Sequence, residues 1–525
     1  MHFVGVRAHG LPCNTTVVRF RTVFLVPLVL AFAASCKSSS DKPTPPDAGI
    51  ADGGAADDAS SQDSGPARTG PLDPLYVDSA INHVILAGQS NALGIGTLQN
   101  TVLSTTQPAT NLMFDVGVIP LAGCNGDGCL TYQTPSAFAP LVEGDQYGTT
   151  DFNYPVETPA SGLASQASSL AKSVYQFGRH ADYPMQHDLL VSNVARSGNS
   201  YTCLSKAGCN YHDASLLKPF TQLVSDVTAA QAIATSQGKS YVVRAVANVH
   251  GEADNDAYDA VPSSSEFPGL NGLADYGAGL VKWQSDFEST IKSVTKQAQP
   301  VPMFISQISG WTAAKASRVA QYQLDAHANA PGKVILVGPS YPFDIDPQDC
   351  LHFSSASSRR LGEYFAKAYA KVVLGGEVWE PVRPKAITRT GAVITVQFYV
   401  PKPPLVFDTT LVSEAANKGF LVTDGGGANE TISEVAISGS DTVTITLAAA
   451  PSGSTTLSYA QNQLHPAARN ANGELAPGTC SGPVDHGPER PAGARGNLHD
   501  SDDMVSASGG TPLVDWAVQF TTPVP

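Results

Sequence analysis

The chain has little charge and no cluster of basic residues. Asp, Glu, Lys and Arg make up 15% of its 525 residues, and the excess of acidic over basic residues gives a formal net charge of −15. Nucleic-acid-binding domains need a stripe or run of Lys and Arg to meet the phosphate backbone. We therefore expect no nucleic-acid partner. Two domains or more are expected from the length alone.

Long apolar runs are also scarce, and the one near the N-terminus is too short to span a bilayer comfortably. Residues 22–34 are predominantly apolar and follow Arg19 and Arg21, a pattern typical of an export signal. The run leads into Ala33-Ala34-Ser35-Cys36, which resembles the end of a bacterial lipoprotein signal, where the cysteine receives the lipid. An ordinary signal peptide with a chance cysteine is the alternative.

Residues 1–36 are accordingly expected to be a lipoprotein signal, with Cys36 as the lipidation site and anchor to the membrane. Lys37 rather than Asp follows Cys36, and by resemblance to bacterial lipoproteins this favours the outer membrane or cell surface of the bacterial cell envelope. Residues 37–72 hold almost no large apolar side chain and are expected to be a disordered tether.

Cysteine spacing does not favour a zinc site, because no two cysteines have the C-x-x-C spacing and histidines do not cluster. Six of the eight cysteines follow the signal, and an even number in an exported chain indicates disulfides, with fifteen pairings open. Short loops favour Cys124–Cys129 and Cys203–Cys209, which leaves Cys350 and Cys480.

Apolar runs alternate with helix-like stretches from about residue 73 to 378, and this pattern predicts an α/β domain with a parallel sheet covered on both faces. The expected strands are 83–87, 188–194, 241–249, 301–307 and 333–337. The expected helices are 161–177, 215–236, 277–298, 313–328 and 354–373. Residues 100–160 fit poorly and are interpreted as an inserted loop region.

From residue 379 to 525 the pattern predicts an all-β, sandwich-like domain. The expected strands are 392–400, 419–422, 442–447, 455–459 and 513–520, separated by Gly and Asp turns. Pro381 and Pro384 would end the preceding helix. Residues 493–502 are interpreted as a loop held by its own Asx-type hydrogen bonds, and Trp379 and Trp516 as core residues.

A serine near the start of the α/β region and an Asp-x-x-His pair near its end are the candidate catalytic groups. Ser90 directly follows the first expected strand, and Asp349 and His352 follow the last. In open α/β sheets the site lies beyond the carboxyl ends of the strands. A hydroxyl, an imidazole and a carboxylate are the parts of a nucleophilic acyl-transfer site.

Four blocks in this order resemble the SGNH hydrolases, and within them the sialate O-acetylesterase-like and carbohydrate esterase family 6 branch. They are Gly88-Gln89-Ser90-Asn91, Arg196-Ser197-Gly198-Asn199-Ser200, His250-Gly251-Glu252-Ala253-Asp254 and Asp349-Cys350-Leu351-His352-Phe353. The resemblance implies a flavodoxin-like three-layer α/β/α fold, with Ser90 as nucleophile, His352 as general base and Asp349 as its orienter.

The resemblance also implies an oxyanion hole built from the backbone N–H groups of Ser90 and Gly198. The family places Asn or Gln where this chain has His250, which either donates to the oxyanion in its place or only packs beside the site. Glu252 is expected to be a scaffold for neighbouring loops. Neither a metal nor a cofactor is required for this chemistry.

The expected function is hydrolysis of acetyl esters on carbohydrates, with an acetylated carbohydrate as the substrate partner. Two alternatives remain open. In the first alternative, the chain is a lipoprotein that binds glycans without catalysis. In the second, it is an esterase that acts on small acyl or lipid esters.

Overall fold

The computed structural model describes residues 78–94, 104, 107–123, 130–143, 157–177, 186–208, 217–255, 272–309, 318–344, 352–461, 467–469, 475–480, 495–507 and 509–525. Contacts divide the chain into two compact units, Met1–Asp63 and Ser64–Pro525, and all of these residues lie in the second. The expected signal and the expected tether both fall outside the described residues. No helix in the described part is long and apolar enough to cross a membrane.

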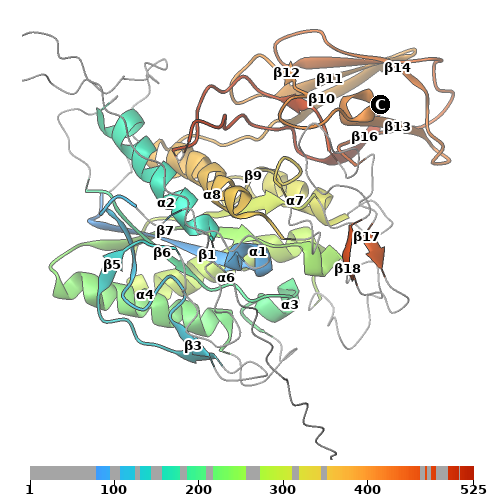
Figure 1. Cartoon of the computed structure of the whole chain (residues 1–525). Helices are drawn as coiled ribbons and strands as arrows, with labels where there is room; N and C mark the ends of the chain where they lie inside the picture. Colours follow the sequence, from blue (N-terminus) through green and yellow to red (C-terminus); the bar gives the residue numbers. More distant parts are fainter. Residues whose placement is uncertain are drawn as a thin grey trace, which may run out of the picture. The chain divides into compact units, whose positions relative to one another are not determined.

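The largest sheet has seven strands in the order β5-β2-β6-β1-β7-β8-β9 (Figure 1). All neighbours are parallel except β5 and β2. Its five long strands, numbered along the chain, follow the order 2-1-3-4-5, one of the two common orders of doubly wound sheets. The strands are β1 (Ile81–Gly88), β2 (Asn111–Phe114), β5 (Phe138–Pro140), β6 (Asp188–Asn193), β7 (Tyr241–Val249), β8 (Met303–Gln307) and β9 (Val334–Pro339).

Helices cover both faces of this sheet because its strands are apolar on both. In β1, Ile85 and Ala87 belong to one core cluster, while Val84 and Leu86 belong to another. The first cluster includes α4 (Pro219–Ser236), α6 (Tyr276–Thr295) and α7 (Arg318–Asn329), and the second includes α2 (Pro159–Leu170) and α8 (Ser355–Tyr369). The result is three layers, helices, sheet and helices.

Two glycines allow α2 and α8 to pack backbone to backbone. A Cβ atom at Gly162 would lie 1.9 Å from the carbonyl oxygen of Arg359, and one at Gly362 would lie 2.0 Å from that of Pro159. Side-chain caps begin both helices, since Thr158 accepts from the N–H of Ala160 and Ser354 from that of Ser357. The position of α8 matters because it starts three residues after His352.

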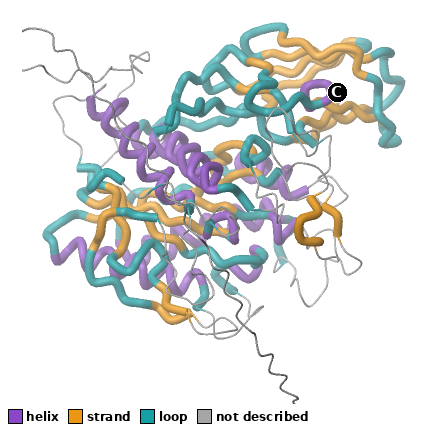
Figure 2. Tube along the Cα trace, viewed as in Figure 1, coloured by secondary structure: helices purple, strands orange, loops and turns teal. Residues whose placement is uncertain are grey.

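Antiparallel sheets follow the last helical residues. One has the order β10-β11-β15-β14 and another β13-β16-β20, and Phe398 of β11 packs on Phe520 of β20 with ring centroids 6.3 Å apart. Figure 2 shows that strands and loops dominate the part of the structure where Figure 1 labels these strands. The strands are β10 (Arg383–Thr390), β11 (Val393–Tyr399), β13 (Phe420–Asp424), β14 (Ile432–Ile437), β15 (Thr442–Leu447), β16 (Thr455–Tyr459) and β20 (Phe520–Val524).

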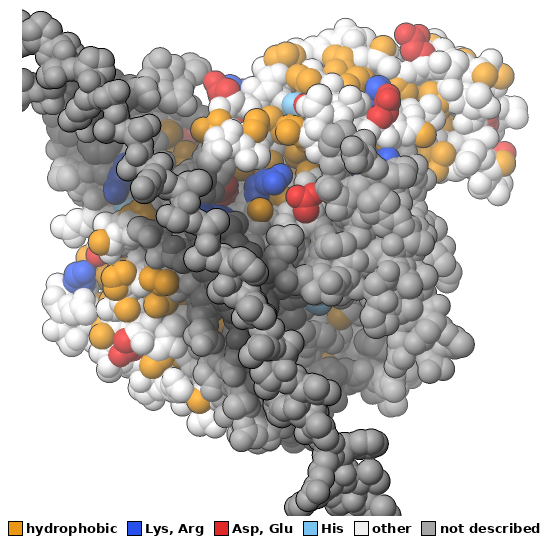
Figure 3. All heavy atoms as spheres, viewed as in Figure 1, with side chains coloured by type: hydrophobic (Ala, Val, Ile, Leu, Met, Phe, Trp, Pro, Cys, Tyr) orange, Lys and Arg blue, Asp and Glu red, His pale blue; other side chains and the backbone are white. Residues whose placement is uncertain are grey.

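Shorter elements complete the described part. They are α1 (Ser90–Leu93), α3 (Tyr201–Leu204), η1 (Ala171–Phe177), η2 (Ala370–Leu374), η3 (Ala416–Gly419), β3 (Leu121–Gly123), β4 (Leu130–Tyr132), β12 (Val406–Phe407), β17 (Ala467–Arg469), β18 (Leu475–Cys480) and β19 (Leu498–His499). On the face shown in Figure 3, the charged side chains of the described residues are scattered among polar and apolar ones.

The structure confirms the α/β class with a mostly parallel sheet and further β sheets, and it corrects two details. Residues 100–160 are not only an insertion, because β2 and β5 extend the main sheet. The strand expected at 513–520 is wrong, since β20 begins only at Phe520. Residues 513–520 are all buried, and Tyr341, Tyr364 and Gln307 bond to the segment. Its apolar pattern therefore reflects packing rather than sheet pairing.

Candidate active site

Ser90 lies at the carboxyl end of β1, beside the end of β7. Gly88 has φ +120°, and a Cβ atom there would lie 2.0 Å from the carbonyl oxygen of Val249, so only glycine allows the two strand ends to come this close. The N–H of Gln89 donates to that same oxygen at 3.0 Å. Strand order reverses between β1 and β7, which is where doubly wound sheets bind ligands.

Ser90 is also the first residue of α1, a helix of four residues that ends at Gly94. Backbone N–H groups at a helix start have no acceptor within the helix. The hydroxyl of Ser90 makes no hydrogen bond to any residue in the described part, His352 included. Such bonds are often long before substrate binds, so the placement is compatible with a nucleophile.

The second block forms a turn next to Ser90. The N–H of Arg196 donates to the carbonyl of Gly88 at 3.1 Å, which ties this turn to the end of β1. Gly198 is exposed and has φ +67°, a backbone conformation that favours glycine. Its N–H meets no acceptor among the residues that the structure describes, and it is therefore available to a substrate oxygen.

The turn that carries His352 contacts the residue after Ser90. The N–H of Phe353 donates to Oδ1 of Asn91 at 3.1 Å, although the two residues are 262 positions apart in sequence. The structure thus brings the first and fourth blocks together. Asp349 and Cys350 lie outside the described residues, so the orientation of His352 by Asp349 stays a prediction.

His250 has both ring nitrogens engaged within the protein. Its Nε2 lies 2.9 Å from the carbonyl oxygen of Asn199 and its Nδ1 lies 2.7 Å from the hydroxyl of Tyr276. Because a carbonyl only accepts, Nε2 carries the proton and Nδ1 accepts from Tyr276. Neither nitrogen is left to donate to an oxyanion, so the geometry favours the alternative in which His250 packs beside the site.

Burial keeps the His250 ring neutral at ordinary pH. Burial lowers its pKa to about 4, against the effect of the Asn199 carbonyl, which raises it. Asp254 lies nearby, with Oδ2 3.6 Å from Nε2 of His250, and accepts from the N–H of Tyr201 at 2.7 Å. His250 and Asp254 thus fix the backbone on either side of Ser200, and with it the Gly198 turn.

Several residues of this network were not predicted from the sequence. Asn91 and Asp254 lie within the quoted blocks, but nothing in a single sequence showed which partners they would have. Tyr276 follows an Asp at the start of a helix and carried no signal of its role. Burial of Glu252 and its bond from Asn91, at 3.1 Å, agree with its expected scaffold role.

Cys203 is disulfide-bonded. Its predicted partner Cys209, and Cys124, Cys129 and Cys350, lie outside the described residues. The pairings therefore stay predictions.

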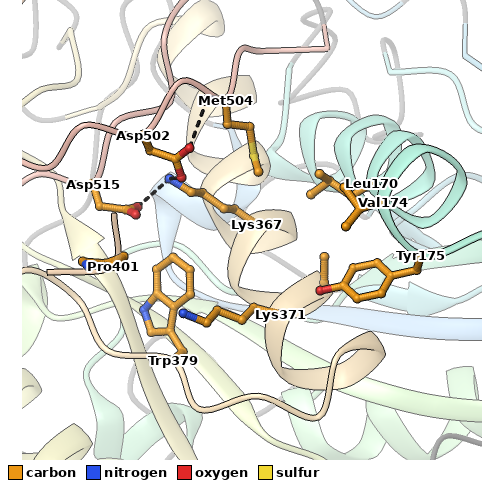
Figure 4. Close-up of a pocket in the computed structure, with 11 residues that line it drawn as sticks. Leu170, Val174, Tyr175, Lys367, Lys371, Trp379, Pro401, Asp502, Met504 and Asp515 are labelled. Atoms are coloured by element: carbon orange, nitrogen blue, oxygen red, sulfur yellow. Dashed lines mark hydrogen bonds and ion pairs between the residues drawn. The ribbon is translucent and has the colours of Figure 1, made fainter. Parts of the chain in front are cut away.

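A cavity shown in Figure 4 lies away from the Ser90 turn, between the carboxyl-terminal half of α8 and the last segment of the chain. Its lining includes Lys367, Lys371, Trp379, Asp502 and Asp515. Its volume of about 20 Å³ suits one water molecule rather than a sugar. The cavity is therefore not the candidate substrate site.

Three carboxylates near this cavity, those of Asp500, Asp502 and Asp515, come within 4.8 Å of one another. Lys367 Nζ lies 2.9 Å from Asp502 Oδ2 and 2.8 Å from Asp515 Oδ1. The ammonium group thus occupies the place that a cation would take. Asp500 also accepts from the N–H groups of Asp502 and Asp515, and Asp502 from that of Met504. The bond between Asp502 and Asp500 is of the Asx type expected for residues 493–502, but residues 493 and 494 lie outside the described part and Leu498–His499 form strand β19. Trp379 and Trp516 are both buried as expected.

No protein-family model and no curated protein sequence matches the chain. Similar solved structures include a carbohydrate acetylesterase from Xanthomonas citri, at 12% identity over 84% of this chain and 80% of that chain with a TM-score of 0.49. Another is a carbohydrate acetylesterase from Sinorhizobium meliloti, at 11% identity over 55% and 99% of the two chains with a TM-score of 0.29.

A third is a carbohydrate esterase family 2 enzyme with a carbohydrate binding domain from Corynascus thermopiles, at 15% identity over 56% and 66% of the two chains with a TM-score of 0.26. Likenesses this distant assign no family. The function proposed for this chain therefore rests on its own residues.

Proposed function

We propose that the protein is a serine esterase of the SGNH type that removes acetyl groups from carbohydrates. One observation carries the proposal. Asn91, next to Ser90, accepts the N–H of Phe353, next to His352, at the switch point of the sheet, and this contact supports the pairing of the candidate nucleophile with the candidate base. The 2-1-3-4-5 strand order supports the flavodoxin-like architecture that the four blocks imply.

The proposed reaction has two halves. Ser90 Oγ attacks the acetyl carbonyl carbon while His352 takes the hydroxyl proton, and the N–H groups of Ser90 and Gly198 bind the oxyanion. The intermediate collapses, the sugar hydroxyl leaves with the proton from His352, and an acetyl-enzyme remains. Water then attacks with its proton going to His352, acetate leaves, and Ser90 regains its proton.

Asp349 is assigned to hold the tautomer of His352, and His250 to brace the Gly198 turn. The sialate O-acetylesterase-like and carbohydrate esterase family 6 branch is the one that the four blocks resemble. This resemblance is the reason to propose an acetyl group on a carbohydrate as the substrate. Sialic acid, xylan and other acetylated polysaccharides are all within the proposal.

Acetate release from a panel of acetylated glycans tests the proposal, with the purified protein compared with Ser90→Ala and Asp349→Asn. We expect release by the parent, none above background for Ser90→Ala, and a loss of several orders of magnitude for Asp349→Asn. A folded parent that releases no acetate from any glycan or simple acetyl ester would leave glycan binding as the better function. Faster cleavage of long acyl esters than of acetyl esters would favour a lipid esterase.

We further propose that Cys36 carries a lipid that anchors the enzyme to the bacterial cell envelope, at the outer membrane or cell surface. The support is sequence alone, the apolar run before Ala33-Ala34-Ser35-Cys36 and the tether after it. Metabolic labelling with an alkyne fatty acid should mark the parent and not Cys36→Ser. Equal labelling of both would refute lipidation at this cysteine.

A further inference from the structure

Asn91 joins three of the four sequence blocks through one side-chain amide. Asn91 is buried, with 1% of its surface exposed. Its Nδ2 donates to Glu252 Oε1 at 3.1 Å, and its Oδ1 accepts the N–H of Phe353 at 3.1 Å. The amide therefore lies between the turn of Ser90, the block of Glu252 and the turn of His352.

The two partners together determine which way this amide points. A backbone N–H only donates, so the carbonyl of Asn91 must face Phe353, and its amino group then donates to Oε1 of Glu252. In the opposite orientation, oxygen would face the carboxylate and the amino group would face an N–H. Both contacts would be lost in a buried place, where unpaired polar groups are costly.

Ala92 and Leu93 of α1 lie in the same apolar core cluster as Phe353, and the Asn91 amide adds a directional contact between the Ser90 and His352 turns. The helix has four residues, too few to be stable alone. Gln89 bonds instead to the third block, its Oε1 accepting from the N–H of Ala253 at 3.3 Å. Asn91 is the neighbour of Ser90 that reaches the turn of His352.

We propose that Asn91 is a positioning residue for the esterase reaction, and that Glu252 acts through it by helping to fix its orientation. The inference rests on the proposed function. Proton transfer from Ser90 to His352 needs a separation of about 2.6–3.2 Å, and a misplacement of about 1 Å costs on the order of 10²-fold in rate. The Asn91 amide links the two backbone turns that set this separation.

Exchanging the two side chains tests the pair. In Asn91→Asp, the new carboxylate faces the carboxylate of Glu252, and the repulsion between them displaces it from the N–H of Phe353. We expect kcat to fall by about 10²-fold with KM nearly unchanged. Glu252→Gln should keep most of the activity, because its amide oxygen still accepts from Asn91. The double variant Asn91→Asp with Glu252→Gln restores one donor facing one acceptor and should recover most of the lost kcat.

Asn111→Asp is the matched control. Asn111 is equally buried, accepts from Ser168 and donates to Gln107, and lies on β2, which β6 separates from β1. Its substitution should lower thermal stability and leave kcat within about twofold, since it touches neither turn. A loss of kcat in this control equal to that of Asn91→Asp would overturn the proposal, because any buried amide would then have the same effect.

Hydrogen exchange gives a second measure that does not need turnover. The Phe353 N–H should exchange faster in Asn91→Asp and slow again in the double variant. Wild-type kcat in folded Asn91→Asp, or a double variant no better than it, would overturn the proposal. Unchanged exchange at Phe353 would do the same. A parent without any esterase activity would refute the proposed function instead, and the exchange data would then decide whether the pair holds the two turns together.

Discussion

Lys367 Nζ lies 2.8 Å from Asp515 Oδ1, and this buried ion pair joins helix α8 to the last segment of the chain (Figure 4). The same ammonium group donates to the carbonyl of Leu513 at 2.6 Å. One turn earlier, the hydroxyl of Tyr364 donates to the carbonyl of Val514 at 2.8 Å. Since α8 starts three residues after His352, the C-terminal segment is part of the support of the candidate site.

Replacing Lys367 by Met should be strongly destabilising. The substitution leaves the carboxylate of Asp515 buried without its cation and leaves Asp502 with only Lys402, at 3.6 Å. Removing one partner of a buried pair costs about 3–5 kcal/mol. Urea denaturation measures the change. Lys282→Met is the control, because the Lys282–Asp286 pair is largely exposed on the lysine side and such pairs contribute about 0–1 kcal/mol. Equal losses in the two variants would contradict the assigned importance of the buried pair.

Removing residues 379–525 should leave a chain that does not fold. The first core cluster includes residues of α7 and β9 together with residues of β11, β16 and β20. The Tyr341 hydroxyl donates to the carbonyl of Ala517, and Gln307 exchanges two bonds with the backbone of Gln519. Removing residues 1–63, a separate unit by contacts, is the control and should leave the melting temperature unchanged. A soluble, cooperatively melting 64–378 fragment would show that the α/β part is autonomous.

Buried parallel strands were the most predictable part of the fold. The strand expected at 241–249 matches β7 (Tyr241–Val249) residue for residue, because a continuous apolar run is long enough to be distinct. Strand β10 was missed, since its burial alternates only weakly, with charged residues at 383, 385 and 389. The error at 513–520 has the opposite cause. This segment is a loop buried on both sides, so its residues are largely apolar although it forms no strand before Phe520.

The candidate site was predictable as a set of blocks but not as a set of contacts. Ser90, Gly198 and His352 were identified from local pattern and resemblance, and the described parts of their blocks meet in the structure. Their connections run through Asn91, Asp254 and Tyr276, which are distant in sequence from their partners. A single sequence carries no information on such pairings, and for His250 the resemblance alone suggested the oxyanion role that its two bonds disfavour.

The variants His250→Phe and His250→Gln distinguish two roles of His250, support of the Gly198 turn and donation to the oxyanion. Phe cannot bond to the buried carbonyl of Asn199, which should cost about 1–3 kcal/mol and loosen the Gly198 turn. Gln retains an N–H and should keep more of both stability and kcat. If His250→Phe kept the stability of the parent and lost only kcat, His250 would be an oxyanion donor after all. Urea denaturation and acetate release measure the two effects.

The pH dependence gives an independent test of the buried His250 ring. Burial lowers its folded pKa from 6.5 to about 4, so its neutral form is favoured in the folded state. The resulting stability is present above pH 6.5 and is lost as pH falls through about 4. His250→Gln lacks this titration, and its stability should therefore fall less steeply between these pH values. Parallel curves for the two proteins would contradict a buried neutral ring.

Glu143 should make the protein less stable at alkaline pH. Burial, and then the carboxylate of Glu157, raise the pKa of Glu143 from 4.5 to about 8. Because the folded pKa is the higher one, the favourable contribution is complete below pH 4.5 and is lost as pH rises through about 8. In Glu143→Gln, the amide oxygen still accepts from the Thr158 hydroxyl and the Ser161 N–H, which the carboxylate now binds at 2.6 and 3.1 Å.

The variant Glu143→Gln should therefore match the parent at pH 5 and exceed its melting temperature at pH 9. The exposed Glu434→Gln is the control and should show no such divergence. The effect should extend to the candidate nucleophile, since the backbone of Glu157 touches the end of α1, where a Cβ atom at Gly94 would lie 2.6 Å from the Glu157 carbonyl oxygen. If ionisation of Glu143 loosens this contact, the parent loses esterase activity above pH 8 before it unfolds, and Glu143→Gln retains it. Loss of activity at the same pH in both proteins would show that ionisation of Glu143 does not affect the Ser90 turn.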